Sequence, residues 1–286
     1  MSAITGIDHT LIGVRDLEKA RASYARLGFT PCPRGSHIGW GTANYCLMFP
    51  DDYVEILGIV DPSQFTNNLD AFLAKREGLM GLAWATRDGN AVKAELERAG
   101  IAADGPKDLK RRLELPEGTV LPEFKLVYPS PGATPSLASF VCQHLTPDLL
   151  RRPEWLAHPN GANGLVGITV AVEDSSGLAA AYGRVFGMGA VTRTDDTVVV
   201  RVGPHVVMFA PSEALDLLHP GFELPAGAEL PLAAVMTVAV ADLAKTSSFL
   251  RGRSIQHDDV EGQAIMVPPS QACGVWLEFV ARPAKN

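Results

Sequence analysis

The sequence predicts an α+β protein in which four βαβββ modules pair into two domains. Three observations lead to this prediction. An apolar strand that ends in Asp, followed by a short helix and a Gly, occurs four times along the chain. Gly and Pro supply 27 and 21 of the 286 residues, which favours many short elements joined by tight turns. A polar segment with three Pro, residues 146–163, separates the second copy of the pattern from the third.

The composition excludes several classes of protein. Hydrophobic residues make up 47% of the chain and charged residues 20%, which is too apolar for a disordered protein. The formal charge of −7, without a long run of one sign, argues against nucleic acid as a partner. The sequence contains no run of about 18 apolar residues, so we expect no membrane span.

The first residues and the cysteines indicate a cytoplasmic protein. The N-terminus lacks a basic region and carries Asp8 and His9 within an apolar run, unlike a signal peptide. The cysteines show neither a C-x-x-C motif nor the spacing of a metal site, so they are expected to be reduced thiols. They are Cys32, Cys46, Cys142 and Cys273.

The repeated pattern predicts where the helices begin and end. The four strand segments are 6–16, 78–88, 164–174 and 232–242. Each segment ends in Asp, whose carboxylate can accept hydrogen bonds from the free amides of the first helical turn. A Gly that follows each Asp can adopt the left-handed conformation that ends a helix of about three turns. These residues are Gly28, Gly100, Gly187 and Gly252.

Further strands are predicted after three of the helices. They span 38–42, 44–49 and 53–60 in the first module, 191–194, 197–202 and 205–210 in the third, and 258–260, 263–267 and 275–280 in the fourth. The second module carries an insertion, expected at 115–121 and 128–135. The basic run Lys107–Arg112 is expected to be a solvated loop or helix end.

Pairing of the modules defines the expected domains. A single βαβββ unit has one apolar sheet face, so two units must pair to close a core. We expect an N-terminal domain over residues 1–145, a linker over 146–163 and a C-terminal domain over 164–286.

Motifs in the first module resemble those of a known superfamily. Gly6-Ile-Asp-His9 opens the first strand, and Tyr53-Val-Glu55-Ile-Leu-Gly58 closes the module after the hairpin Gly39–Phe49. Together with the paired modules, these motifs resemble the vicinal oxygen chelate superfamily, in particular its glyoxalase-like and bleomycin-resistance-like branch. The resemblance implies a cupped sheet around a divalent metal, Zn, Ni, Mn or Fe, which chelates two oxygens of a small-molecule substrate. Glyoxalases, extradiol dioxygenases, epimerases and antibiotic-inactivating thiol transferases share this fold, so the fold does not select a reaction.

In metal-dependent members of that superfamily, the ligands come from the first and last strands of the modules. The matching first-strand positions hold His9, Gly81, Gly167 and Val235, and the last-strand positions hold Glu55, Gln143, Met208 and Glu278. His9, Glu55 and Gln143 are therefore the expected metal ligands, with water completing the coordination. The C-terminal domain keeps only Glu278, so we expect it to be a scaffold or a dimerisation half, which allows a homodimer.

Other residues near these strands are candidates for binding the substrate or for proton transfer. His37 is a candidate general base, because imidazole titrates near neutral pH. His144 is an alternative ligand or acid, but strict alternation turns it away from the cavity if Gln143 faces in. Asn44 is expected to orient an enolate or carbonyl oxygen. The candidate lining residues are Trp40, Trp84 and Phe140.

The leading functional hypothesis is a divalent-metal lyase or isomerase that acts on a small carbonyl or vicinal-oxygen substrate. His9 and Glu55 would hold the metal, and His37 or His144 would carry the proton. An extradiol-type dioxygenase is an alternative, although Gly167 in the third module and Val235 in the fourth remove the two histidines that its iron needs in the C-terminal domain. Another alternative is a metal-free protein that binds an apolar or antibiotic ligand.

Overall fold

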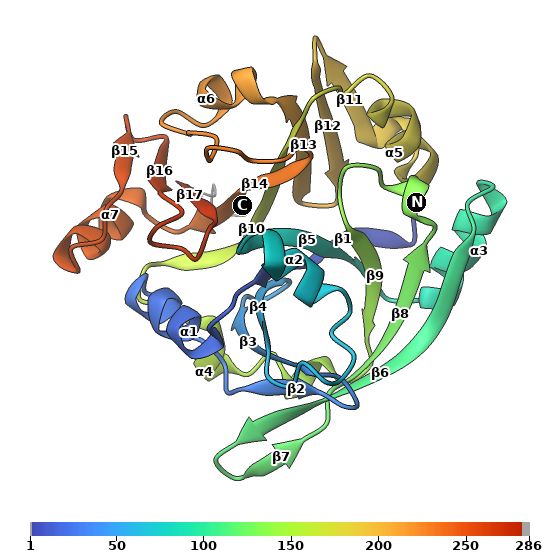
Figure 1. Cartoon of the computed structure of the whole chain (residues 1–286), viewed down its shortest axis with the longest axis horizontal. Coiled ribbons are helices and arrows are strands. Elements are labelled where there is room, and N and C mark those ends of the chain that lie inside the picture. Colours follow the sequence, from blue (N-terminus) through green and yellow to red (C-terminus); the bar gives the residue numbers. More distant parts are fainter. Residues whose placement is uncertain (1, 282–286) are drawn as a thin grey trace.

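The computed structural model describes residues 2–281 and has a mixed α+β fold built on two large sheets (Figure 1). The first two copies of the repeated pattern contribute to one sheet, and the last two contribute to the other. The predicted α+β fold class with paired modules is therefore confirmed.

The first sheet contains nine strands. They are β1 (Ile4–Gly13), β2 (Gly35–His37), β3 (Thr42–Met48), β4 (Tyr53–Ile59), β5 (Gly78–Thr86), β6 (Ala103–Leu115), β7 (Gly118–Val120), β8 (Glu123–Pro129) and β9 (Ser139–His144). The helices of this part are α1 (Leu17–Arg26), α2 (Leu69–Lys75), α3 (Gly89–Arg98) and the 3-10 turn η1 (Pro131–Ala133). The strand β7 and the turn η1 lie in the insertion predicted for the second module.

The second sheet contains eight strands in the order β11-β12-β13-β10-β14-β17-β16-β15. They are β10 (Ala162–Val172), β11 (Val191–Thr194), β12 (Thr197–Val202), β13 (His205–Pro211), β14 (Leu232–Val240), β15 (Asp258–Val260), β16 (Ala264–Val267) and β17 (Trp276–Ala281). The helical segments are η2 (Pro147–Leu149), α4 (Pro153–Leu156), α5 (Leu178–Phe186), η3 (Met188–Ala190), η4 (Ser212–Ala214), α6 (Leu215–Leu218) and α7 (Leu243–Gly252). In residues 2–281, no helix is long and apolar enough to cross a membrane.

The first sheet closes into a barrel. Its strand order is β2-β3-β4-β1-β5-β9-β8-β6-β7, and β2 pairs with β6 as well as with β3. We call this closing pair the β2–β6 seam, and Figure 1 shows the long β6 curving round to reach β2. The seam pairs Gly35 with Leu113, Ser36 with Arg112, and His37 with Arg111.

The basic run Lys107–Arg112 lies inside β6, so the expectation of a solvated loop or helix end is wrong. Alternate residues of this strand face the barrel interior, because side chains of a strand point to opposite faces in turn. Leu109 and Leu113 pack there with apolar residues of neighbouring strands, and Arg111 between them is also buried. In the sequence, the charged residues on the outer face of β6 make this alternation of buried and exposed residues hard to recognise.

The predicted helix caps are largely confirmed. The side chains of Asp16, Asp88 and Asp242 accept hydrogen bonds from first-turn amides of α1, α3 and α7. Asp174 instead accepts from Ser176 in a turn, and α5 starts later, after Gly177. The glycines expected at the helix ends have positive φ in three modules, whereas Gly252 is the last residue of α7.

A buried group of polar contacts joins the two sheets. The carboxylate of Asp52, before β4, accepts hydrogen bonds from His205 Nε2 at 3.0 Å and from the backbone of Leu165 at 2.8 Å. The other ring nitrogen of His205 accepts a bond from the backbone of Ile7 at 3.0 Å. Separating the sheets would leave these buried donors and acceptors without partners, which is costly. The network therefore holds the second sheet against β1.

Tyrosine titration reports on this packing. Burial raises the pKa of all five tyrosines of the chain, and it raises the pKa of Tyr45 to about 12 with help from Glu18. Because the folded pKa values exceed the unfolded ones, this stabilisation is complete below about pH 10 and is lost at higher pH. We expect the phenolate absorbance to appear only as the protein unfolds in alkali. A stepwise titration near pH 10 in the folded protein would contradict this expectation.

Candidate functional site

Ionisable side chains gather inside the barrel. Asp8 and His9 lie on β1, with 3% of each residue exposed, and Glu55 on β4 is 5% exposed. The β1–β5 register shifts between Ile7 and His9, which is the mark of a β-bulge at Asp8. Because a bulge re-aims a side chain, the neighbours Asp8 and His9 can contact each other within the barrel.

Asp8 connects two histidines. Its Oδ2 atom lies 2.7 Å from His9 Nδ1 and 3.0 Å from His144 Nε2. Burial by itself would raise the pKa of Asp8, but the contacts with His144 and His9 outweigh it, and the pKa is strongly lowered. An ionised carboxylate only accepts hydrogen bonds, so both imidazoles donate to it. The contact through Nδ1 orients the ring of His9 so that its Nε2 atom faces Glu55.

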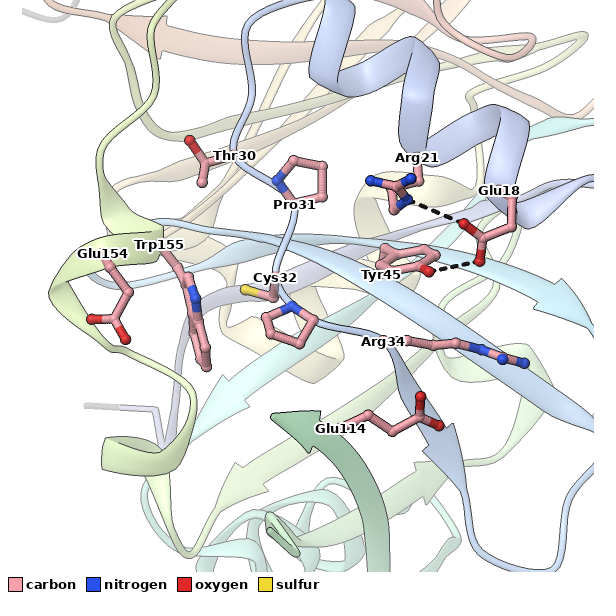
Figure 2. Close-up of a pocket in the computed structure, with 11 residues that line it drawn as sticks. Glu18, Arg21, Thr30, Pro31, Cys32, Arg34, Tyr45, Glu114, Glu154 and Trp155 are labelled. Carbon is pink, nitrogen blue, oxygen red and sulfur yellow. Dashed lines mark hydrogen bonds and ion pairs between the residues drawn. The ribbon is translucent and has the colours of Figure 1, made fainter. Parts of the chain in front are cut away.

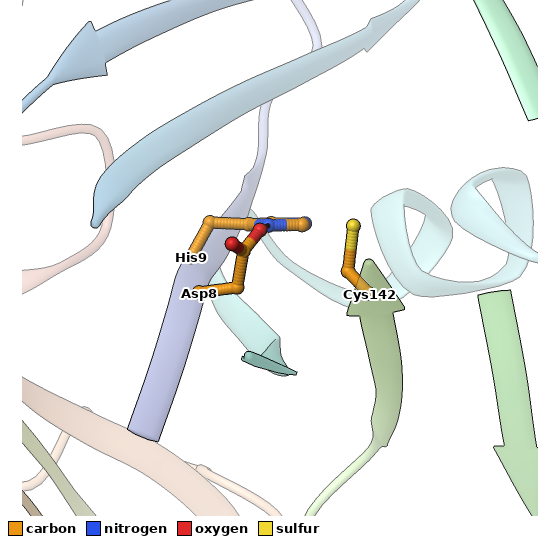
Figure 3. A group of neighbouring side chains, drawn as sticks. All are labelled: Asp8, His9 and Cys142. Atoms are coloured by element: carbon orange, nitrogen blue, oxygen red, sulfur yellow. Dashed lines mark hydrogen bonds and ion pairs between the residues drawn. The ribbon is translucent and has the colours of Figure 1, made fainter. Parts of the chain in front are cut away.

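Cys142 completes a group of three metal-ligating residue types (Figure 3). Ligand atoms of Asp8, His9 and Cys142 all lie within 4.8 Å of one another. Burial, together with the charges of Asp8 and Glu55, raises the pKa of the Cys142 thiol well above its usual range. The thiol of Cys142 is therefore protonated in the absence of a metal ion.

Glu55 is surrounded by donors and cations. His9 Nε2 lies 3.4 Å from Glu55 Oε2, and His37 Nε2 lies 3.9 Å from Glu55 Oε1. The Asn44 amide donates a hydrogen bond to Oε1, and the Arg111 guanidinium lies 3.8 Å from that atom. Burial opposes ionisation of Glu55, but His9, His37 and Arg111 outweigh it, so the pKa of the carboxyl is lowered.

Several buried atoms of this cluster lack a hydrogen-bond partner, and His9 Nε2 is one of them. It lies within ion-pair distance of the Glu55 carboxylate. The ring is held in place by stacking on Tyr53, with centroids 4.4 Å apart, and by the edge of Phe140 at 5.8 Å. An imidazole fixed through one nitrogen, with its other nitrogen facing a carboxylate, is the arrangement of a metal-binding histidine.

His37 reaches the cluster from the β2–β6 seam. Its Nδ1 atom is 2.9 Å from the Thr42 hydroxyl, and its ring lies against Trp40 with centroids 5.1 Å apart. Burial lowers the pKa of His37, which keeps the ring neutral at neutral pH and able to accept a proton through Nε2. Trp40 thus contacts the histidine rather than the carboxylates.

Arg111 is a site residue that the sequence analysis missed. It is 3% exposed, and its Nη1 atom donates to the sulfur of Cys46 at 3.2 Å. Its place opposite His37 results from the β2–β6 seam, a pairing between distant segments. The available signal was its position in the alternating row with Leu109 and Leu113, in which a single Arg replaces an apolar residue.

Gln143, an expected metal ligand, lies outside the cluster. Its side-chain oxygen accepts from Gly89 N at 2.9 Å, and its amide donates to the Arg87 carbonyl oxygen at the start of α3. His144, the next residue, faces Asp8 inside the barrel. The two residues still point to opposite faces of the strand, but His144 faces inward where Gln143 was expected to.

Strand register explains this difference. Glu55 pairs with Leu11, five residues before the capping Asp of the first module. The corresponding residue of the second module is Ala83, which pairs with Phe140. Phe140 is therefore the structural counterpart of Glu55, and it lines the cluster beside His9 as an apolar wall.

Trp84, an expected substrate contact, faces away from the cluster. Its indole nitrogen donates to Ser139 Oγ at 3.0 Å, and its ring packs 4.7 Å from that of Phe186 on α5. Its neighbour Ala83 packs in the barrel interior instead. The residue belongs to the core between the two sheets, because consecutive strand residues point to opposite faces.

The cupped face of the second sheet has its own buried carboxylate. Glu278 accepts hydrogen bonds from His219 Nδ1 at 3.0 Å and from Thr237 Oγ1 at 2.7 Å. The second nitrogen of His219 lies 2.8 Å from the Thr169 hydroxyl. The segment that carries α6 thus brings a histidine that satisfies Glu278, and it packs apolar side chains over this face.

A cleft of about 570 Å³ opens beside the barrel (Figure 2). It is bordered by α1, by the chain leading to β2, and by α4, and includes Glu18, Arg34, Glu114 and Trp155. None of the predicted site residues lines it. The cleft still borders the barrel interior, because Cys32 and Trp155 belong both to its lining and to the apolar cluster inside the barrel.

Solved structures with the same fold have low sequence identity. A hypothetical protein from Staphylococcus aureus is 12% identical with a TM-score of 0.69, covering 96% of this chain and 98% of that one. A mutant of 4-hydroxymandelate synthase from Streptomyces coelicolor is 13% identical with a TM-score of 0.59, covering 99% of this chain and 94% of that one. A fusion of a xylose isomerase-like TIM barrel with 4-hydroxyphenylpyruvate dioxygenase is 13% identical with a TM-score of 0.56, covering 100% of this chain and 50% of that one.

The family assignment comes from the sequence itself. No curated protein matches the chain. Residues 7–186 match the glyoxalase-like domain family, and this range contains every residue of the buried cluster. The chain therefore belongs to the glyoxalase-like domain family of the vicinal oxygen chelate superfamily.

Proposed function

We propose that the protein is a divalent-metal enzyme of the lyase or isomerase type, acting on a small molecule with a carbonyl or two neighbouring oxygens. The observation that carries this proposal is the buried Nε2 atom of His9, which has no hydrogen-bond partner and faces the Glu55 carboxylate at 3.4 Å. A buried polar atom without a hydrogen bond is rare, so its place beside an ionised carboxylate supports a cation-binding role for the two residues.

The ligands that fit best are His9, Glu55 and His37. Both imidazoles are held through Nδ1, by Asp8 and by Thr42, and so each offers Nε2 toward Glu55. When bound, a divalent ion would polarise a substrate oxygen as a Lewis acid. The cluster accommodates added positive charge, because the ionised Asp8 and Glu55 outnumber the single buried guanidinium of Arg111.

The remaining residues of the cluster have separate roles. His37, one of the two expected proton carriers, would offer Nε2 to the metal ion in this arrangement and so would not carry the proton through that atom. His144 contacts the same oxygen of Asp8 as His9 does, and it therefore acts as a positioning residue for His9. Asn44 holds one oxygen of Glu55, and its own carbonyl oxygen lacks a partner and can accept a hydrogen bond from a substrate hydroxyl.

The donor set also favours a second candidate, an extradiol-type dioxygenase. Two histidines and one carboxylate form the set that holds Fe(II) in many oxygenases. The resemblance placed the iron site in the C-terminal domain, where both histidines are replaced, whereas His37 can supply a second histidine inside the first barrel. Oxygen uptake by the iron-loaded protein with a series of catechols distinguishes this candidate from an isomerase or lyase.

Metal titration tests the proposal. Purified protein, stripped with a chelator, would be titrated by calorimetry with Zn²⁺, Ni²⁺, Mn²⁺ and Fe²⁺ in turn. We expect at least one ion to bind at one site, and His9→Ala to weaken its binding by at least about tenfold. The control His257→Ala removes an imidazole between α7 and β15 and should leave binding unchanged. Absence of binding by the unmutated protein would refute a metal enzyme and favour a metal-free binding protein.

A further inference from the structure

We infer that Arg111 recognises the carboxylate of the substrate, so that the site takes small organic acids with an apolar body. This inference rests on the proposed function for the location of the site, and it adds the chemical class of the substrate. The main observation is that the buried guanidinium of Arg111 has fewer hydrogen-bond acceptors around it than it has N–H donors. Arg111 is 3% exposed and its Nε atom has no hydrogen-bond partner.

The present contacts of Arg111 are weak for a buried cation. Nη1 donates to a neutral thiol, Cys46, at 3.2 Å, and stands 3.8 Å from the nearest oxygen of Glu55. A guanidinium has five N–H donors in a planar fork that matches a carboxylate with two parallel bonds. Glu55 does not provide this match, because its Oε1 atom is already bonded to Asn44 and its Oε2 atom faces His9. An incoming carboxylate would satisfy the fork.

The surroundings of the guanidinium specify the rest of the ligand. Phe124 lies under it, with the ring centre 5.7 Å from the guanidinium carbon. Leu113 and Leu126 belong to the same apolar cluster, and Phe140 stands across the barrel beside His9. Apart from Glu55 on the metal-binding side, these walls are apolar, so we expect the carboxylate to be attached to an apolar or aromatic group.

The cleft described above lies at the end of the β2–β6 seam. The backbone of Glu114 donates to the Arg34 carbonyl oxygen at 3.0 Å, next to the seam, and both residues line the 570 Å³ cleft. Cys32 on the cleft floor packs in the same apolar cluster as Cys46, which contacts Arg111. The cleft therefore borders the apolar cluster that surrounds the guanidinium, although Arg111 itself does not line it.

Binding of a matched pair of probes tests the inference. Benzoylformate carries a carboxylate beside a carbonyl and an aromatic ring, and its methyl ester has the same shape without the charge. Charge-assisted hydrogen bonds contribute about 1.5 to 3 kcal/mol, so we expect the ester to bind about 10- to 100-fold more weakly than the acid in calorimetry. Arg111→Met should remove this preference, and Arg111→Lys should retain part of it, because a lysine keeps the charge but not the fork.

Arg112→Met is the matched control, since Arg112 is the exposed neighbour on the same strand. It should leave the preference for the acid unchanged. The titrations are done with and without the bound metal ion, which separates the two proposals. Arg111-dependent binding of the acid by the chelator-stripped protein would support the inference, whereas the metal titration alone decides the metal enzyme. No binding of benzoylformate by the folded protein, or equal binding of acid and ester, would overturn the inference even if metal binds.

Discussion

Glu55→Gln is expected to lower the free energy of unfolding by about 3 kcal/mol and to abolish tight binding of a divalent ion. The glutamine keeps the size of the side chain but loses its charge. Arg111 then remains as a buried cation without a carboxylate within reach, and breaking a buried pair in this way is costly. The measurements are urea unfolding at pH 7 and metal titration.

Two further variants make this result specific. Glu229→Gln removes a carboxylate of the exposed pair with Lys75 and should change the stability by less than about 0.5 kcal/mol. The double variant Glu55→Gln/Arg111→Met removes both buried charges and should recover part of the lost stability, but not the metal binding. If Glu55→Gln were as stable as the unmutated protein and bound metal equally well, the assigned role of Glu55 would be wrong.

Asp8→Asn is expected to weaken metal binding by about 10- to 100-fold although Asp8 is not a ligand in our proposal. The carboxylate accepts hydrogen bonds from His9 at 2.7 Å and from His144 at 3.0 Å. An asparagine presents one oxygen and one N–H donor group, so it cannot accept from both rings in the same way. His9 would lose the fixed tautomer that directs its Nε2 atom toward Glu55.

Nitrogen chemical shifts of the histidine rings separate this positioning role from simple damage to the fold. In the unmutated protein, Nδ1 of His9 should carry the proton, and in Asp8→Asn a mixture of tautomers should appear while the remaining spectrum is preserved. Asp61→Asn, on the surface after β4, is the control and should alter neither the tautomer nor the affinity. An unchanged tautomer combined with unchanged metal affinity would show that Asp8 does not position His9.

Much of the fold could be predicted from the sequence, because the patterns that predict its elements involve residues close together in the chain. Strand periodicity, a capping Asp and a terminating Gly repeat within each module, and every one of them depends on a few neighbouring residues. The prediction for α5 failed for a local reason too, since Ser176 took the carboxylate of Asp174 and delayed the helix. His9 and Glu55 could be selected in the same way, from their positions on the first and last strands.

The composition of the site depended on contacts that no local pattern contains. A bulge at Asp8 brings this side chain to His9, and the β2–β6 seam sets Arg111 opposite His37. Strand register also explains why His144 rather than Gln143 faces the barrel interior, because a shift of one residue in a strand reverses the face of every side chain. The sequence by itself therefore determined the modules, most of the caps and two residues of the buried cluster. Only the tertiary structure decided which other side chains join them, since strand register and barrel closure are set by packing between segments far apart in the chain.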